Sequence, residues 1–251
     1  MPSSRPVRYW ISAGATHRGR IRTRNQDSFL DRPDLGLWAV ADGMGGHAHG
    51  DRASRRVIDL LSGLPAPRFL GRAARQIEWL LAEANRQLIA DAAAEPGGRT
   101  IIGTTAVAIV AVRAAAALLW VGDSRAYRLR DGRLTLLTLD HTEIQDWILA
   151  GRISPRDAEN HPYSSVLSRA IGAEENLVVD RAIERLRDGD RYLLCSDGLT
   201  KELDEQQIAM ILSASEPRES AQKLTEHACA AGGRDNITAV VIDFRSGRTP
   251  S

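Results

Sequence analysis

The residues best suited to chemistry lie in four short motifs spread along the chain: Asn25-Gln26-Asp27, Asp42-Gly43-Met44-Gly45-Gly46, Ser196-Asp197-Gly198 and Asp235-Asn236-Ile237-Thr238. Each lies at the end of a short apolar run that we interpret as a β-strand. Strands that finish in Asp-Gly can gather carboxylates at one edge of a sheet, and glycine leaves a backbone carbonyl free as a further ligand. Carboxylate and carbonyl oxygens without thiolates suit magnesium or manganese. The motifs therefore predict a metal-dependent hydrolase that acts on phosphate.

The Asp42-Gly43 pair could by itself be an ordinary turn after a strand. The chain continues with Met44-Gly45-Gly46-His47, however, and so many glycines carry a conformational entropy cost that an ordinary turn does not require. Close approach of the backbone to an ion or a phosphate would explain them. We therefore favour a binding site at Asp42 and Gly43.

Three further aspartates are candidates for the same site. Asp197 ends a predicted buried strand, and Asp235 begins another after two glycines. Asp235 could instead form a cap or a turn, as Asp-Asn pairs often do, but in combination with the other motifs it favours a ligand. For Asp123 two interpretations stay open: a bend between strands with Arg125 as its ion-pair partner, or a ligand of a more loosely held cation.

Arginine recurs at alternate positions near the first motif, at Arg18, Arg20, Arg22 and Arg24. The simplest interpretation is the solvent face of a strand. A guanidinium near a metal centre could also hold two oxygens of a phosphate monoester in its planar fork. The composition alone leaves open which arginine would do so.

The histidines and cysteines indicate no rival chemistry. A cysteine phosphatase would carry an arginine six residues after its nucleophile, but Lys201 stands at that distance from Cys195, which we interpret as a buried strand residue. Four histidines are interpreted as surface, capping or structural residues: His47, His49, His141 and His161.

Composition limits the classes of protein that are possible. The chain has 251 residues, of which 43% are hydrophobic, enough for one sizeable core. A formal net charge of +1 argues against a nucleic-acid-binding module. No apolar run reaches the roughly 18 residues of a membrane-spanning helix, and residues 1–8 lack the apolar core of a signal peptide. Two cysteines make neither a disulfide framework nor a zinc site. We expect a cytoplasmic protein without membrane insertion.

The expected secondary structure places the motifs at strand ends. Strands are predicted over 35–41, 104–112, 115–121, 190–196 and 236–244, with a hairpin over 127–137 around Asp131-Gly132. Helices are predicted over 69–94, 205–213 and 218–231. Antiparallel strands with helices inserted in pairs indicate an α+β fold with two packed sheets and helices outside. We expect one domain over 9–245, with flexible termini over 1–8 and 246–251.

Taken in order, the motifs resemble those of the metal-dependent protein phosphatases of type 2C, the PPM family, in its compact bacterial form. The resemblance runs from about Tyr9 to Phe244. A single motif is weakly specific, whereas the ordered set is highly specific. Besides the four motifs above and Arg22-Thr23-Arg24, it includes Gly103-Thr104-Thr105-Ala106, Gly122-Asp123-Ser124-Arg125, Leu139-Asp140-His141-Thr142, His161-Pro162 and Ser168-Arg169-Ala170-Ile171-Gly172.

The resemblance implies a four-layer α/β/β/α sandwich and a site with two manganese or magnesium ions. By position, Asp42 resembles the carboxylate that bridges both ions, with the Gly43 carbonyl on one of them. Asp197 and Asp235 resemble ligands of the other ion. Asp123, together with Asp197, matches the position that holds a third, weaker ion in bacterial members.

The resemblance also assigns residues around the metals. Asp27 matches an acidic residue that orients metal-bound water, and Arg22 matches the phosphate-binding arginine. The segment from 153 to 171 resembles a mobile flap beside the site. Two departures stand out: Gln26 replaces a glutamate of some members, which implies looser metal binding, and Met44 replaces a histidine proposed as general acid in eukaryotic members, which leaves the proton donor open.

The implied activity is hydrolysis of phosphoserine and phosphothreonine in proteins by a metal-activated water, reversing a bacterial serine/threonine kinase in signalling. The implied partners are phosphoproteins, including that kinase and its substrates. Two alternatives remain: a phosphodiesterase or small-molecule phosphatase, and a pseudophosphatase that binds phosphoproteins. The intact Asp42, Asp197 and Asp235 favour an enzyme. Secretion-system control and cell-wall signalling are both compatible with the sequence.

Overall fold

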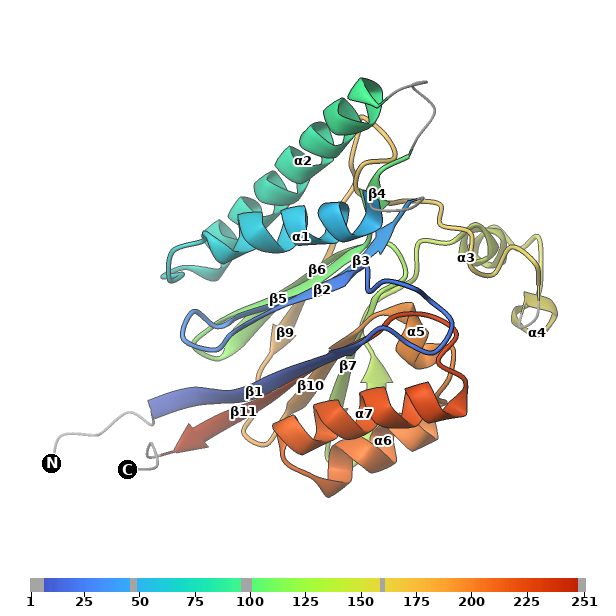
Figure 1. The fold of residues 1–251 in the computed structure, drawn as a ribbon. Coiled ribbons are helices and arrows are strands. Elements are labelled where there is room, and N and C mark those ends of the chain that lie inside the picture. Colours follow the sequence, from blue (N-terminus) through green and yellow to red (C-terminus); the bar gives the residue numbers. More distant parts are fainter. Residues whose placement is uncertain (1–6, 46–48, 96–100, 159–160, 248–251) are drawn as a thin grey trace, which may run out of the picture.

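The protein is a four-layer sandwich, in which two antiparallel β-sheets pack face to face and helices cover both outer faces (Figure 1). The computed structural model describes residues 7–45, 49–95, 101–158 and 161–247. The architecture confirms the predicted α+β fold. Within these residues, no helix combines the length and the apolar character needed to cross a bilayer.

One sheet has five strands in the order β1-β11-β10-β7-β8. Their bounds are β1 Val7–His17, β7 Arg125–Arg130, β8 Arg133–Leu136, β10 Arg191–Cys195 and β11 Ile237–Gly247. The predicted hairpin is confirmed: β7 turns into β8 through Asp131 and Gly132, whose φ angles of 52° and 75° are both positive, as a type I′ turn requires. The pairing of β1 with β11 extends two residues beyond the predicted domain boundaries at 9 and 245.

The other sheet has six strands in the order β2-β3-β5-β6-β9, with β4 paired to β3. Their bounds are β2 Asp27–Arg32, β3 Leu37–Met44, β4 Gly103–Thr104, β5 Ala106–Val112, β6 Ala115–Val121 and β9 Asp180–Arg185. The central strands β3, β5 and β6 are almost entirely apolar and buried, because helices cover one face and the first sheet covers the other.

Two pairs of helices close the sandwich. Helices α1 (His49–Ser62) and α2 (Leu70–Ala94) pack on the six-stranded sheet, while α6 (Glu205–Ala214) and α7 (Pro217–Ala231) pack on the five-stranded sheet. The short helix α5 (Asp197–Thr200) follows β10 directly. Helices α3 (Glu143–Leu149) and α4 (Pro155–Ala158) stand apart at one end of the sandwich (Figure 1).

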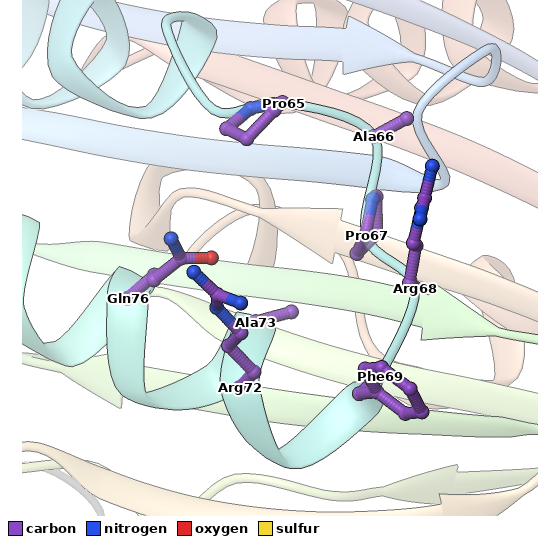
Figure 2. A pocket seen from close by; sticks show the side chains of 8 residues that line it. All are labelled: Pro65, Ala66, Pro67, Arg68, Phe69, Arg72, Ala73 and Gln76. Atoms are coloured by element: carbon purple, nitrogen blue, oxygen red, sulfur yellow. The ribbon is translucent and has the colours of Figure 1, made fainter.

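The connection between α1 and α2 bounds a cavity of about 390 Å³ on the outer helical layer (Figure 2). Pro65 and Pro67 lie on one side of it, and Arg72 and Gln76 of α2 on the other. The extended backbone of Phe69 makes this residue the N-cap of α2, so the helix begins one residue later than predicted. None of the predicted site residues lines this cavity.

The sequence patterns miss three strands and misassign one segment. Strands β1, β2 and β9 were not predicted; all three lie at the edge of a sheet. The alternating arginines over 18–24, interpreted as one face of a strand, instead belong to the loop between β1 and β2. The reason is local: Gly19 has a φ of 79°, and a Cβ there would lie 2.2 Å from the carbonyl oxygen of Asp235. The chain therefore turns where a strand would continue.

The two sheets approach each other closely where β1 faces β2. A Cβ on Gly14 of β1 would lie 2.2 Å from the ring of Phe29 in β2. These two strands flank the loop over 18–26, so their close packing keeps the two strands that carry this loop together.

We therefore expect Gly14→Ala to lower the free energy of unfolding by about 1–3 kcal/mol, the usual cost of overpacking a core. Urea unfolding would measure the change. The matched control is Gly71→Ala in the first turn of α2, where a Cβ would meet only the Arg75 side chain at 3.8 Å. This substitution should be neutral or stabilising by up to about 1 kcal/mol. Equal losses in both variants would contradict the steric argument.

Candidate active site

A cavity of about 590 Å³ collects most of the predicted site residues from segments far apart in the chain: Arg22, Asp42, Gly43, Asp123, Asp197 and Asp235. Strand order explains why they meet. Strands β7, β10 and β11 are antiparallel neighbours, so the start of β7, the end of β10 and the start of β11 share one edge of their sheet. The end of β3 contributes the remaining carboxylate from the second sheet.

Asp27 lies behind the cavity, directly opposite Asp42 in the register of β2 and β3. Its Oδ2 accepts hydrogen bonds from Ser196 Oγ at 2.8 Å and Thr238 Oγ1 at 2.7 Å. Its Oδ1 is buried without a partner among the described residues. Burial raises the pKa of Asp27 to about 6, an effect that the two hydroxyl hydrogen bonds only partly offset.

Asp42 sits at the centre of a negative field. Loss of solvation raises its pKa well above the usual value. The surrounding charges with the largest influence on it are all negative: Asp27, Asp197, Asp123 and Asp235.

Asp123 and Asp197 continue this cluster. Burial, with the nearby charges of Asp197 and Asp140, raises the pKa of Asp123 to about 7. Arg125 donates to both oxygens of Asp140, and its Nη2 lies 2.7 Å from Asp140 Oδ2. The interpretation in which Arg125 pairs with Asp123 is therefore wrong. Asp197 begins α5, and its Oδ1 is buried without a hydrogen-bond partner in the described ranges.

The donor set fits a hard divalent cation. A buried carboxylate oxygen without a partner costs free energy unless it pairs with a charge or binds a metal, and here Asp27 and Asp197 each have one. All the candidate donors are oxygens, as magnesium and manganese prefer. Gly43 has no room for a side chain, since a Cβ would lie 1.9 Å from the Gly50 carbonyl oxygen.

The candidate carboxylates are not arranged around a single point, as the ligands of a bound ion would be. Within the described residues, no three histidine, cysteine or acidic side chains meet at one point. Basic groups hold two of the carboxylates instead: Arg22 donates through Nε and Nη2 to both oxygens of Asp235, at 2.8 and 2.9 Å, and Lys201 pairs with Asp197. The site therefore fits a divalent cation by the chemistry of its donor atoms and by its negative charge.

Arg22 reaches the cavity because Asn236 fastens the loop that carries it. The Asn236 side chain accepts a hydrogen bond from the Gln26 backbone N–H at 2.8 Å. It donates to the carbonyl oxygens of Arg18 and Arg24 at 2.8 and 2.9 Å. Of the four alternating arginines, Arg22 is the one that lines the cavity.

Several cavity residues were not predicted. Lys201 lies four residues after Asp197, a helical spacing that favours an ion pair and could have identified it. Thr105 also lines the cavity, and its hydroxyl accepts a hydrogen bond from the Asp42 backbone N–H at 3.1 Å. From the predicted flap, Ser165, Leu167, Ser168, Arg169 and Ala170 line the same cavity.

No histidine in the described part of the chain lines this cavity. His141 is buried, and its Nδ1 accepts a hydrogen bond from the Gly122 N–H at 3.1 Å. His161 lies against Trp147 and Tyr163, with ring centroids 5.5 and 5.7 Å away. His47 lies outside the described residues.

Comparison with known proteins gives a consistent result. The family profile described as protein phosphatase 2C matches residues 13–228. The serine/threonine protein phosphatase PstP of Mycobacterium tuberculosis is 38% identical over 240 residues, which is 94% of this chain. The chain spans about half, 46%, of that relative's length. The serine/threonine phosphatase stp of Listeria welshimeri is 37% identical over 236 residues, covering 91% of this chain and 93% of that protein.

Solved structures share the fold. A crystal structure of the catalytic domain of the serine threonine protein phosphatase PstP, in complex with two manganese ions, matches with a TM-score of 0.82 and 36% identity. The match covers 95% of this chain and 100% of that one.

The raised pKa of Asp27 predicts a pH-dependent effect of Asp27→Asn in chelating buffer. Because the pKa of Asp27 is higher in the folded protein than its ordinary value of 3.8, the protonated carboxyl stabilises the fold. This stabilisation is fully present below pH 3.8 and is lost as the pH rises through the folded-state pKa of about 6. The variant should therefore match the wild type near pH 4 and become more stable than it above pH 6, by up to about 3 kcal/mol. Urea unfolding at pH 4, 6 and 8 would measure this.

The control is Asp34→Asn on an exposed turn, where Arg32 lowers the pKa of the carboxyl. That substitution should give no such gain at high pH. A difference between wild type and Asp27→Asn that is the same at pH 4 and pH 8 would contradict the assignment of the buried charge.

Proposed function

The chain belongs to the protein phosphatase 2C family, the PPM serine/threonine protein phosphatases, and we propose that it hydrolyses phosphoserine and phosphothreonine in proteins at a dinuclear manganese or magnesium centre. The observation that carries the proposal is the meeting of Asp42, Asp123, Asp197 and Asp235 around one cavity, with Arg22 at the same place. A single catalytic domain over 9–245 would carry the activity.

The proposed metal ligands follow from the positions of the donors. Asp42 would bridge both ions, with the Gly43 carbonyl on one of them and Asp197 and Asp235 on the other. Asp123, with Asp197, would hold a third ion more weakly. Two bound ions would supply an activated water and hold the phosphoryl oxygens for in-line attack. The two manganese ions in the PstP crystal structure support a centre of two divalent ions.

Asp27 would orient the attacking water from behind Asp42. The hydroxyls of Ser196 and Thr238 fix its Oδ2, which leaves Oδ1 as its free acceptor. Because Ser196 precedes Asp197 in the chain, the same segment supplies a proposed metal ligand and the group that holds Asp27.

Arg22 would bind the phosphate of the substrate. Its planar fork now holds Asp235, and 53% of its side chain is exposed, so it can turn toward a ligand in the cavity without uncovering the core. An ion on Asp235 would compete for the oxygens that the fork now uses. The guanidinium would then be available for two phosphate oxygens, the geometry for which arginine is suited.

The proposed partners are phosphoproteins. We propose that the enzyme reverses the action of a bacterial serine/threonine kinase, with that kinase and its substrates as phosphoprotein partners. The names of the relatives in Mycobacterium and Listeria, both called serine/threonine phosphatases, support protein substrates over small-molecule phosphates.

The decisive test is phosphate release from a phosphothreonine peptide, with manganese and with excess chelator. We expect turnover with manganese and none with chelator. In Asp197→Asn the turnover rate should fall by more than about a hundredfold, because the substitution removes a proposed metal ligand, whereas loss of a residue that only hydrogen-bonds to a ligand costs about 10- to 100-fold. Asp34→Asn, on the exposed turn, should keep full activity. Turnover of nucleotides instead of phosphopeptides would favour a small-molecule phosphatase. Binding without turnover would favour a pseudophosphatase.

A second test separates Arg22 from its neighbours. Arg22→Lys keeps the charge but loses the fork, so kcat/KM should fall by about 10- to 100-fold, the equivalent of one charge-assisted hydrogen bond. Arg24→Lys is the matched control, because Arg24 belongs to the same loop but does not line the cavity. Equal losses in the two variants would point to the loop as a whole and against a specific phosphate contact.

A further inference from the structure

We propose that Lys201 is an internal cation that competes with divalent ions for the carboxylates of Asp197 and Asp235 and thereby lowers the affinity of the site for metal. The inference rests on the proposed metal site and adds a residue that controls its loading.

The position of Lys201 allows one amine to reach two carboxylates. The residue follows α5 directly and lies one helical turn after Asp197. Its Nζ contacts Asp197 Oδ2 and lies 3.9 Å from Asp235 Oδ2. Asp197 follows β10 and Asp235 precedes β11, so the amine joins the ends of two neighbouring strands.

The other basic side chains of the cavity are held by carboxylates other than Asp197. Arg22 holds Asp235 through its fork, and Arg169 donates to Asp180 at 3.0 Å. Among the described residues that line the cavity, Lys201 is thus the cation that pairs with Asp197. Asp123 and Asp235 add further negative charge near its amine, so Lys201 is attracted by more than the one carboxylate that it contacts.

An ammonium group and a divalent ion cannot use the same carboxylate oxygens at once. Magnesium binds its oxygens at roughly 2.0–2.1 Å, and an ammonium at hydrogen-bond distance from those oxygens would repel it. A metal on Asp197 Oδ2 therefore requires Lys201 to leave that oxygen. A metal on Oδ1 of the same carboxylate, which has no partner among the described residues, would lie close enough to be repelled by the ammonium. A lysine can move away, because its charge sits at the end of a flexible four-carbon stem and 38% of its side chain is exposed. Breaking the ion pair between Lys201 and Asp197 costs free energy, and this cost makes metal binding weaker.

The chain provides its own control. It has two lysines, Lys201 and Lys223. Lys223 also pairs with an acidic residue four positions away on a helix, Glu219 at 2.7 Å, and 41% of its side chain is exposed. It does not line the cavity. Lys223→Met therefore removes a similar ion pair without touching the proposed metal site.

The test measures manganese affinity directly. Protein loaded with Mn²⁺ would be titrated with EDTA, and apparent Kd values obtained from the bound metal. Lys201→Met and Lys201→Gln should each bind at least one ion about tenfold more tightly, equivalent to about 1.4 kcal/mol. Lys201→Arg, which keeps the charge, and Lys223→Met should each stay within about threefold of the wild type, well under that difference.

A second readout distinguishes competition from a structural role. In chelator, Lys201→Met should unfold at a lower temperature than the wild type, because the carboxylates lose their cation. In saturating Mn²⁺ this difference should disappear or reverse. A difference that persists unchanged in Mn²⁺, or Mn²⁺ affinities in Lys201→Met and Lys201→Gln equal to or below that of the wild type, would overturn the proposal. A wild-type protein that binds no Mn²⁺ would instead overturn the proposed metal site.

Discussion

The structure depends on one electrostatic constraint: carboxylates from both sheets are brought together where little water can screen them. Asp27 and Asp123 are each only 8% exposed, and the charges around Asp42 are negative. Such a cluster costs free energy unless positive charge enters it or protons neutralise it. The fold imposes the cost because antiparallel strands bring their ends to a common edge. The residues of the site can be understood by how each one compensates this charge or fixes its position.

Positioning relies on neutral hydrogen bonds that add no charge. Asn236 uses both ends of its amide to fasten the loop of Arg22, and the hydroxyls of Ser196 and Thr238 hold Asp27. Thr105 binds the backbone at Asp42 in the same way. Since these groups remain neutral, they can define the geometry of the carboxylates whichever cation balances them. The arrangement of the site and its charge balance are thus set by different residues.

The sequence predicted the parts of the molecule that local pattern determines. Helix α2 has a continuous apolar stripe, and the β7–β8 turn has an Asp-Gly pair, so both were predicted nearly to the residue. Strand β9 was missed because its exposed face mixes the charged Arg181 and Arg185 with the apolar Ile183, so no alternation of apolar and polar residues marks it as a strand. The partner of Arg125 and the reach of Lys201 to Asp235 depend on how distant segments pack. No pattern within one segment contains that information.

The same charge constraint explains why a glutamine at position 26, where some members of the family carry a glutamate, suits this site. The Gln26 amide lies against the glycine-rich backbone beside Asp42, with Nε2 3.4 Å from the Gly45 carbonyl oxygen. A carboxylate at this position would add a further negative charge to a cluster in which Asp27 and Asp42 already have raised pKa values. A neutral Gln26 on one side and the cation of Lys201 on the other both reduce the net negative charge. Both features would make the protein easier to fold without metal, and both would weaken its hold on the ions. The same charge balance therefore links the stability of the folded chain to the metal concentration at which the proposed activity would begin.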